Sequence, residues 1–233
     1  MGLRNWLVRQ SLSDRRSGSL ASRLRRRRWD RVQSLLGLQG KESVVDVGGT
    51  DRSWWFADWA GRVVRCNLDR KATNSGLRVV GDGCALPFGD AVFEVAFSNS
   101  VIEHLSTLEA QVRFARELRR VGRCHFVQTP NKWFPIEPHY LFPLFQFFPV
   151  VIQRWLHTHF NIGTFKKSDQ FGTIRLMTRK ELQRLFPESQ IVSERIGPLV
   201  KSWYVVLRKS DGKSADSLAD PPAAAMDQPT HRH

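Results

Sequence analysis

The sequence predicts an α/β fold built on a parallel sheet, and two observations support this prediction. The chain has 233 residues, of which 41% are hydrophobic, so it can bury one sizeable core. Short apolar runs of roughly 4 to 8 residues also alternate with helical segments, a pattern typical of a parallel sheet covered on both faces. The predicted strands cover residues 43–47, 62–68, 77–81, 92–98 and 124–129.

Helical spacing of apolar residues predicts the helices that cover the sheet. An amphipathic helix over residues 24–36 packs Trp29 and Val32 on the core and ends before Gly37. Residues 106–120 keep a 3-to-4 spacing, which predicts a crossover helix with Ser106 near its N-cap. Thr178 and Glu181 have the spacing of a capping box, which predicts a helix over 178–186. Two closing strands are expected at 190–196 and 200–208.

These elements predict one folded domain over residues 24–209 with an insertion at 131–172. Eleven of the chain's 25 aromatic residues fall between Trp133 and Phe171, within or next to this insertion. One interpretation is a cap with its own small core. In the other, apolar side chains cover an apolar acceptor or enter a bilayer interface. The side chains that would do so are Phe142, Phe145, Phe147 and Phe148.

The formal net charge of +14 is concentrated at the N-terminus, where the first 31 residues hold ten arginines against Asp14 and Asp30. Residues 1–23 are predicted to be a disordered basic arm that could contact an anionic membrane or, less favourably, nucleic acid. Residues 210–233, rich in Asp, Ser, Ala and Pro, are predicted to be a disordered tail. Cys66, Cys84 and Cys124 show no metal-binding or disulfide spacing, which predicts no metal site and a reducing, cytoplasmic location.

Acidic residues and glycines follow successive predicted strands. The first strand ends in the run VVDVGGTD at residues 44–51, which holds Asp46, Gly48 and Gly49. Asp69 ends the second strand at a spacing suited to an acidic residue that binds ribose hydroxyls, and Asp82 follows the third. Because ligands of open α/β sheets bind beyond the carboxyl ends of the strands, this ordered set predicts a nucleotide-containing cofactor.

The ordered motifs resemble the class I S-adenosylmethionine-dependent methyltransferase family, of the methyltransferase type 11-like kind. They are VVDVGG, GDGCALPF, VFEVAFSNSVIEHL, ELRRV and TPN, spread over roughly residues 25–208. The resemblance implies a Rossmann-like, seven-stranded, mostly parallel sheet with an antiparallel final strand. It also implies S-adenosyl-L-methionine as the cofactor.

The resemblance assigns roles by position. Asp46 and Gly48 would line the amino-acid end of the cofactor and Asp69 would bind the ribose diol. Asp82 and Gly83 would bind the adenine edge, and Leu86 would cover its face. Gly49 and Ser98 complete the implied cofactor-binding set.

One position departs from the family, since Thr50 stands where a second spaced glycine is usual. The departure leaves the path of the loop open. It also argues against a nicotinamide enzyme, because a G-x-G-x-x-G pattern starting at Gly48 would meet Thr50 and Ser53 in place of its later glycines.

Two histidines are candidate bases for a hydroxyl acceptor. His104 follows the fourth strand on the cofactor side and titrates near neutral pH, although a purely structural role for it is equally open. His139, in the proline-stiffened run after the fifth strand, is the second candidate. The resulting hypothesis is methylation at oxygen of a small-molecule, saccharide or lipid-linked acceptor. A nucleic-acid methyltransferase and a non-catalytic cofactor-fold protein are the alternatives.

Overall fold

The computed structural model describes residues 20–50, 54, 59–69, 76–137, 140, 142–160 and 174–208. The proposed C-terminal tail at 210–233 and most of the N-terminal arm lie outside these residues. Helix α2, Leu20–Leu36, begins within the predicted arm, four positions before the predicted start of the folded domain. No helix in the described part of the chain is long and apolar enough to cross a membrane.

A seven-stranded sheet forms the centre of the fold, with strand order β3-β2-β1-β4-β5-β9-β8. The strands β1 to β5 pair in parallel, whereas β9 runs antiparallel to both of its neighbours. This confirms the predicted sheet with its antiparallel final strand. The strands are β1 Val44–Val47, β2 Val63–Asn67, β3 Leu77–Val80, β4 Phe93–Asn99, β5 Gly122–Pro130, β8 Gln190–Ile196 and β9 Leu199–Leu207.

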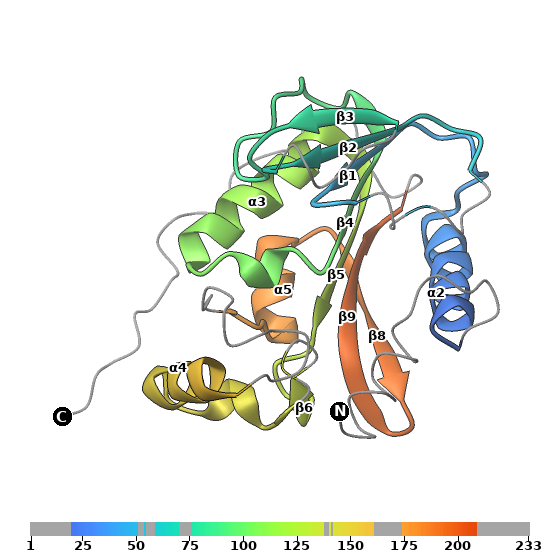
Figure 1. Ribbon diagram of the computed structural model, residues 1–233. Coiled ribbons are helices and arrows are strands. Elements are labelled where there is room, and N and C mark those ends of the chain that lie inside the picture. Colours follow the sequence, from blue (N-terminus) through green and yellow to red (C-terminus); the bar gives the residue numbers. More distant parts are fainter. Residues whose placement is uncertain are drawn as a thin grey trace.

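Helices cover both faces of the sheet (Figure 1). On one face, Trp29, Val32 and Leu36 of α2 pack against β-strand side chains such as Phe97 and Phe126. On the other face, α3, Leu108–Val121, and α5, Arg179–Leu185, pack against the opposite side chains of the same strands. The alternation of side chains along each strand therefore feeds two separate cores, one on each face.

The helix termini confirm one predicted cap and refine another. Thr178 caps α5 and forms the full capping box with Glu181, as its spacing predicts. In α3, however, Thr107 is the N-cap, and its hydroxyl accepts a hydrogen bond from the Ala110 backbone N–H. Ser106, predicted near the N-cap, is the residue just before it, because two successive residues can both cap a helix and helical spacing alone does not choose between them.

The insertion after β5 is a folded cap with a small core of its own. It contains the hairpin of β6, Ile136–Glu137, and β7, Phe142–Pro143, followed by the 3-10 helix η3, Phe145–Phe147, and the helix α4, Val150–His159. Tyr140 and Phe145 stack at its centre with ring centroids 3.9 Å apart. Figure 1 shows α4 standing apart from the sheet, at the end of the molecule where the insertion leaves β5.

His125 provides a test of the core through pH. It is completely buried in β5, where its Nε2 lies 2.7 Å from the Ser189 hydroxyl, and burial lowers its pKa from 6.5 to about 3. Below pH 6.5 the unfolded chain takes up a proton at this residue that the folded chain does not. The free energy of unfolding therefore decreases as the pH is lowered. The loss approaches roughly 1.4 kcal/mol per pH unit until the folded pKa is reached.

We expect His125→Gln, whose amide stays neutral, to remove this contribution. Urea unfolding of the two proteins at a series of pH values between 7.5 and about 4.5 measures it. The stability difference between them should narrow or reverse as the pH falls. A difference that does not change with pH would contradict the buried neutral imidazole.

Candidate active site

The candidate site lies where the strand order reverses, at the carboxyl ends of β1 and β4. The chain runs outward from β1 through β2 to β3 on one side, and from β4 to β5 on the other. At such a reversal, no crossover connection covers the carboxyl ends of the central strands. Ligands of open α/β sheets bind at these strand ends. The predicted residues of the cofactor set lie in or directly after β1, β2, β3 and β4.

The turn after β1 requires both of its glycines. Gly48 has φ +79°, and its backbone N–H donates to the Cys66 carbonyl of β2. A Cβ atom at Gly48 would lie 2.4 Å from Cγ2 of Val101, and one at Gly49 would overlap the carboxylate of Asp46. The main chain thus packs closely between the carboxylate of β1 and the segment after β4. Residues larger than glycine do not fit at these two positions.

Asp46 is a buried carboxylate at the base of this turn, with about 1% of its surface exposed. Trp54 Nε1 donates a hydrogen bond of 2.7 Å to Asp46 Oδ2. Trp54 in turn packs edge-on against Trp29 of α2, at 4.5 Å between ring centroids. Trp54 was missed at the level of sequence because no motif marks it, and it ties the candidate site to the N-terminal helix.

Asn67, at the end of β2, is a second residue that sequence reasoning missed. Its side-chain amide donates to the Gly49 carbonyl at 3.3 Å, and its Oδ1 accepts from the Asp69 backbone N–H at 3.3 Å. Asp69, predicted to bind ribose, is exposed two residues beyond the strand end. The structure thus places an amide next to the glycine turn and a carboxylate further out, and the contact of Asp69 with a ribose stays a prediction.

The segment after β3 forms a tight turn. Asp82 is exposed, and its Oδ1 accepts from the Cys84 backbone N–H at 2.9 Å. Gly83 packs on α3, where a Cβ atom would lie 2.7 Å from the ring of Phe114. The Leu86 side chain is 96% buried in the core beneath the turn, so its predicted contact with an adenine face stays a prediction.

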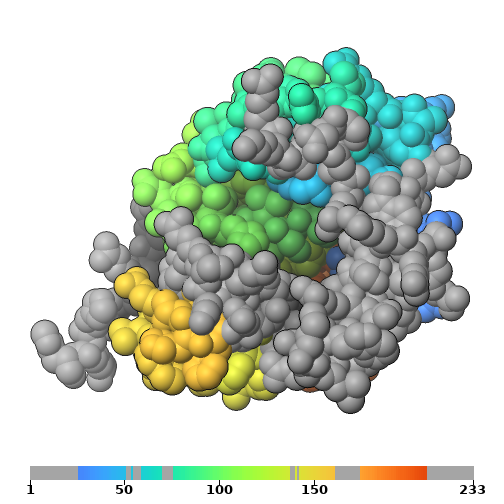
Figure 2. All heavy atoms as spheres, in the orientation of Figure 1, coloured from blue at the N-terminus to red at the C-terminus, as the bar shows by residue number. Residues whose placement is uncertain are grey.

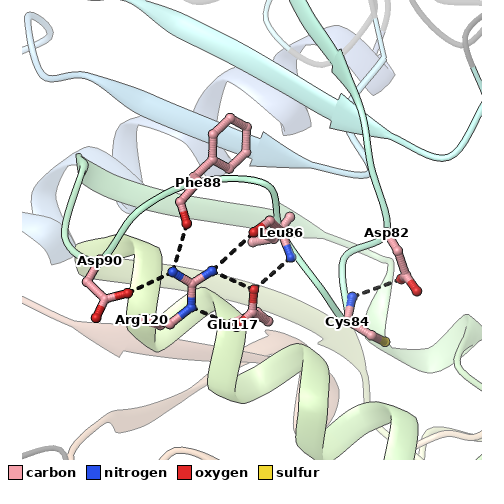
Figure 3. A network of polar contacts seen from close by, with 7 residues as sticks. All are labelled: Asp82, Cys84, Leu86, Phe88, Asp90, Glu117 and Arg120. Carbon is pink, nitrogen blue, oxygen red and sulfur yellow. Dashed lines mark hydrogen bonds and ion pairs between the residues drawn. The ribbon is translucent and has the colours of Figure 1, made fainter.

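Arg120 and Glu117 of α3 hold this segment in place (Figure 3). The Arg120 guanidinium donates to the carbonyls of Phe88 and Leu86 and to the carboxylates of Asp90 and Glu117. Glu117 also accepts from the Leu86 backbone N–H at 2.7 Å. The hydrogen bond from Arg120 lowers the pKa of Glu117, so the pair stays ionised at neutral pH. These five residues form the loop clamp.

The corner after β4 carries one structural carboxylate and one exposed histidine. Glu103, in the 3-10 helix η2, Ile102–His104, is buried and accepts a hydrogen bond from the Thr129 hydroxyl of β5. Its carbonyl accepts from the Arg175 backbone N–H. His104, by contrast, is exposed at the end of η2. Glu103 therefore fixes the corner, while His104 faces the outside of it.

Ser98, another predicted residue, stands apart from this open edge. Ser98 is fully buried in β4, and its hydroxyl donates to the Val47 carbonyl, so it joins the ends of β1 and β4. Its predicted contact with the cofactor stays a prediction. His139 lies outside the described residues.

The side chains at this edge fit S-adenosylmethionine by their chemistry. The ammonium group, ribose hydroxyls and adenine amino group of this cofactor are hydrogen-bond donors, and its sulfur carries a positive charge. Asp69 and Asp82 are exposed carboxylates, which accept hydrogen bonds only. Asn67 adds an amide close to the glycine turn. In a chain of net charge +14, an edge that presents carboxylates suits a cationic ligand.

The loop clamp generates a prediction about Arg120. Replacing Arg120 by alanine should release the turn between Asp82 and Asp90. Two backbone carbonyls of the turn, the Asp90 carboxylate and the carboxylate of the neighbouring glutamate on α3 would all lose the guanidinium as their hydrogen-bond donor. Hydrogen exchange followed by mass spectrometry should show faster exchange in this turn, with a stability loss of roughly 1–3 kcal/mol.

Arg119→Ala is the matched control, since Arg119 belongs to the same helix and pairs with Glu188 rather than with the turn. Exchange in the turn that is equal in both variants would show that Arg120 does not hold it.

Comparison with known proteins finds similarity to methyltransferases. Residues 47–124 match the family model described as "Methyltransferase domain". A protein from Encephalitozoon cuniculi (strain GB-M1) that carries a provisional methyltransferase name is 36% identical over 105 residues, which are 43% of this chain and 50% of that protein. The chain thus matches only half the length of this curated relative.

Solved structures are similar to the chain at low sequence identity. An S-adenosylmethionine-dependent methyltransferase from Clostridium acetobutylicum ATCC 824 has a TM-score of 0.54 at 7% identity, over 87% of this chain and 96% of that one. One from Methanosarcina mazei has a TM-score of 0.47 at 14% identity, over 72% and 92%. Residues 47–124 are thus similar to a methyltransferase domain, and the likeness to the Clostridium structure indicates a shared fold.

Proposed function

We propose that the chain transfers a methyl group from S-adenosylmethionine to an oxygen of a small-molecule, saccharide or lipid-linked acceptor. The observation that carries the proposal is the common location of the glycine turn, Asp69, Asp82 and His104 at one edge of the sheet. The cofactor supplies a methyl group on a positively charged sulfur, which becomes a neutral thioether after transfer. The protein's own task is to align the acceptor oxygen with that methyl group and to take up its proton.

The loop clamp and the buried pair of Asp46 and Trp54 support this task by fixing the edge. The rigid turn after β1 defines one wall, and the clamped segment after β3 defines another. Holding the reacting groups in line can contribute up to about 7 to 11 kcal/mol to lowering the barrier.

His104 is the proposed base. Its exposed imidazole lies directly after β4, on a corner that Glu103 and Thr129 hold from below. The imidazole would accept the hydroxyl proton as the bond between oxygen and the methyl carbon forms. His139, outside the described residues, is a second candidate for the same role.

The partners of the chain are also part of the proposal. The ten arginines among the first 31 residues would hold the protein against an anionic membrane surface from the cytoplasmic side. This contact would be peripheral. A lipid-linked acceptor would then be available at the same surface.

Cofactor binding tests the foundation of the proposal. S-adenosylmethionine at about one hundred times its dissociation constant should stabilise the protein by about 2.7 kcal/mol, seen as a rise in Tm. Asp82→Ala should lose most of this shift because the exposed carboxylate of Asp82 is the proposed acceptor for the adenine amino group.

Asp30→Ala is the matched control for the cofactor test. It also removes an exposed carboxylate, but one on α2 that is not among the predicted cofactor-binding residues. NAD serves as the ligand control. A wild-type protein that responds to NAD and ignores S-adenosylmethionine would overturn the assignment of the cofactor.

Activity tests the base. His104→Gln should retain the shift with S-adenosylmethionine but lose roughly a hundredfold or more of the methyl transfer, because an amide cannot accept the proton. The measurement is incorporation of label from methyl-labelled S-adenosylmethionine into extracted lipids and saccharides.

His159→Gln, which changes an exposed histidine on α4, is the matched control for the base. If His104→Gln transfers methyl at the wild-type rate, His104 has only a structural role.

A further inference from the structure

The outer surface of the insertion is unusually apolar for an exposed surface. Nine of the fifteen large apolar side chains that are exposed in the described part of the chain fall between residues 133 and 160. Large apolar patches on a soluble protein mark interaction surfaces. The nine side chains, which we call the apolar surface, are Trp133, Ile136, Leu144, Phe147, Val150, Val151, Ile152, Trp155 and Phe160.

The apolar surface is distinct from the hydrophobic core of the insertion, which is formed by other side chains. His157 of α4 is buried and lies edge-on to Tyr140, and Leu156 and Phe148 pack against Tyr140 and Phe145. On the opposite side of the same helix, Val151 is 79% exposed and Trp155 is 51% exposed. The helix therefore has one face committed to a core and an outer face that is also apolar.

Aromatic contacts join the parts of the apolar surface. The Trp133 ring stacks on Phe147 at 5.6 Å, and Gln146 donates to the carbonyls of Lys132 and Phe134, which fixes this turn on η3. Trp155 lies 5.7 Å from the ring of Phe160. Because η3 leads through Pro149 directly into α4, the two aromatic groups lie on consecutive elements of the insertion. Figure 2 shows α4 on the outside of the molecule.

Basic side chains accompany the apolar surface. Between residues 132 and 160 the sequence contains Lys132 and Arg154 and one acidic residue, Glu137. Lys132 lies over the Trp133 ring, with its Nζ 5.8 Å from the ring centroid. Tryptophan and the long basic side chains are the residues that favour the boundary between lipid headgroups and acyl chains.

From this combination we infer that the apolar surface docks on an anionic lipid bilayer. Val151 and Trp155 enter the headgroup boundary, and Arg154 and Lys132 contact the phosphates. An anionic bilayer fits this surface better than a second copy of this chain does, because the +14 net charge of each copy would oppose association. The inference adds a docking surface to the proposed function and does not rest on the activity.

Sedimentation with lipid vesicles tests the inference on the full chain. The double variant Val151→Ser with Trp155→Ser removes two exposed apolar side chains, so its fold should be kept. Binding to vesicles of phosphatidylcholine with about one third phosphatidylserine should weaken at least about tenfold relative to wild type. Vesicles of phosphatidylcholine alone should bind wild type less well, since they do not attract the basic side chains.

The matched control is Leu77→Ser with Val92→Ser, two exposed apolar residues at the start of β3 and just before β4. This control should bind vesicles like wild type. Equal weakening by both double variants, or wild-type binding by the Val151 and Trp155 variant, would overturn the inference. The inference would also be overturned if the wild-type protein bound no vesicles but formed a dimer, and the Val151 and Trp155 variant were monomeric. The Tm shift with S-adenosylmethionine, measured on the same samples, separates this result from a failure of the cofactor site.

Discussion

The buried carboxylate of Asp46 is the constraint on which the candidate site depends. A charged group that is almost fully enclosed is stable only where hydrogen-bond donors surround it, and Trp54 supplies one such donor from the α2 face of the sheet. The carboxylate also excludes any side chain at Gly49, since a Cβ atom there would overlap it. The path of the glycine turn therefore follows from one acidic residue on β1, and the aromatic contact of Trp54 with Trp29 links that path to the N-terminal helix.

The opposite face contributes through the loop clamp. Arg120 and Glu117 reach from α3 to carbonyls and an amide of the segment after β3, so the same helix that fills the core also positions Asp82. Each wall of the site is thus supported by a different core, one under α2 and one under α3 and α5. A change deep in either core would be expected to move one wall relative to the other, without touching any side chain that faces the edge.

The positions of the seven strands of the large sheet follow from patterns that are local in sequence. Apolar runs place the strands within about two residues, and the capping box at Thr178 holds because both partners lie in one turn of helix. The contacts of Trp54 and Asn67 could not be predicted in this way, since each depends on how separate strands and helices meet in space. The same reason explains Ser98: the hydrogen bond of its hydroxyl to Val47 depends on the pairing of β1 with β4, whereas its cofactor contact was only implied by the resemblance.

The insertion connects the two halves of the proposal. It begins at the carboxyl end of β5, and β5 lies beside β4, whose carboxyl end carries η2 and His104. A bilayer that contacts the outer face of α4 would therefore lie on the side of the molecule from which the insertion extends, and the base would lie at the same edge of the sheet. One orientation on the membrane would then serve both docking and access of a lipid-linked acceptor, whereas a freely diffusing acceptor would need no such arrangement. The apolar surface thus favours the lipid-linked member of the proposed acceptor classes.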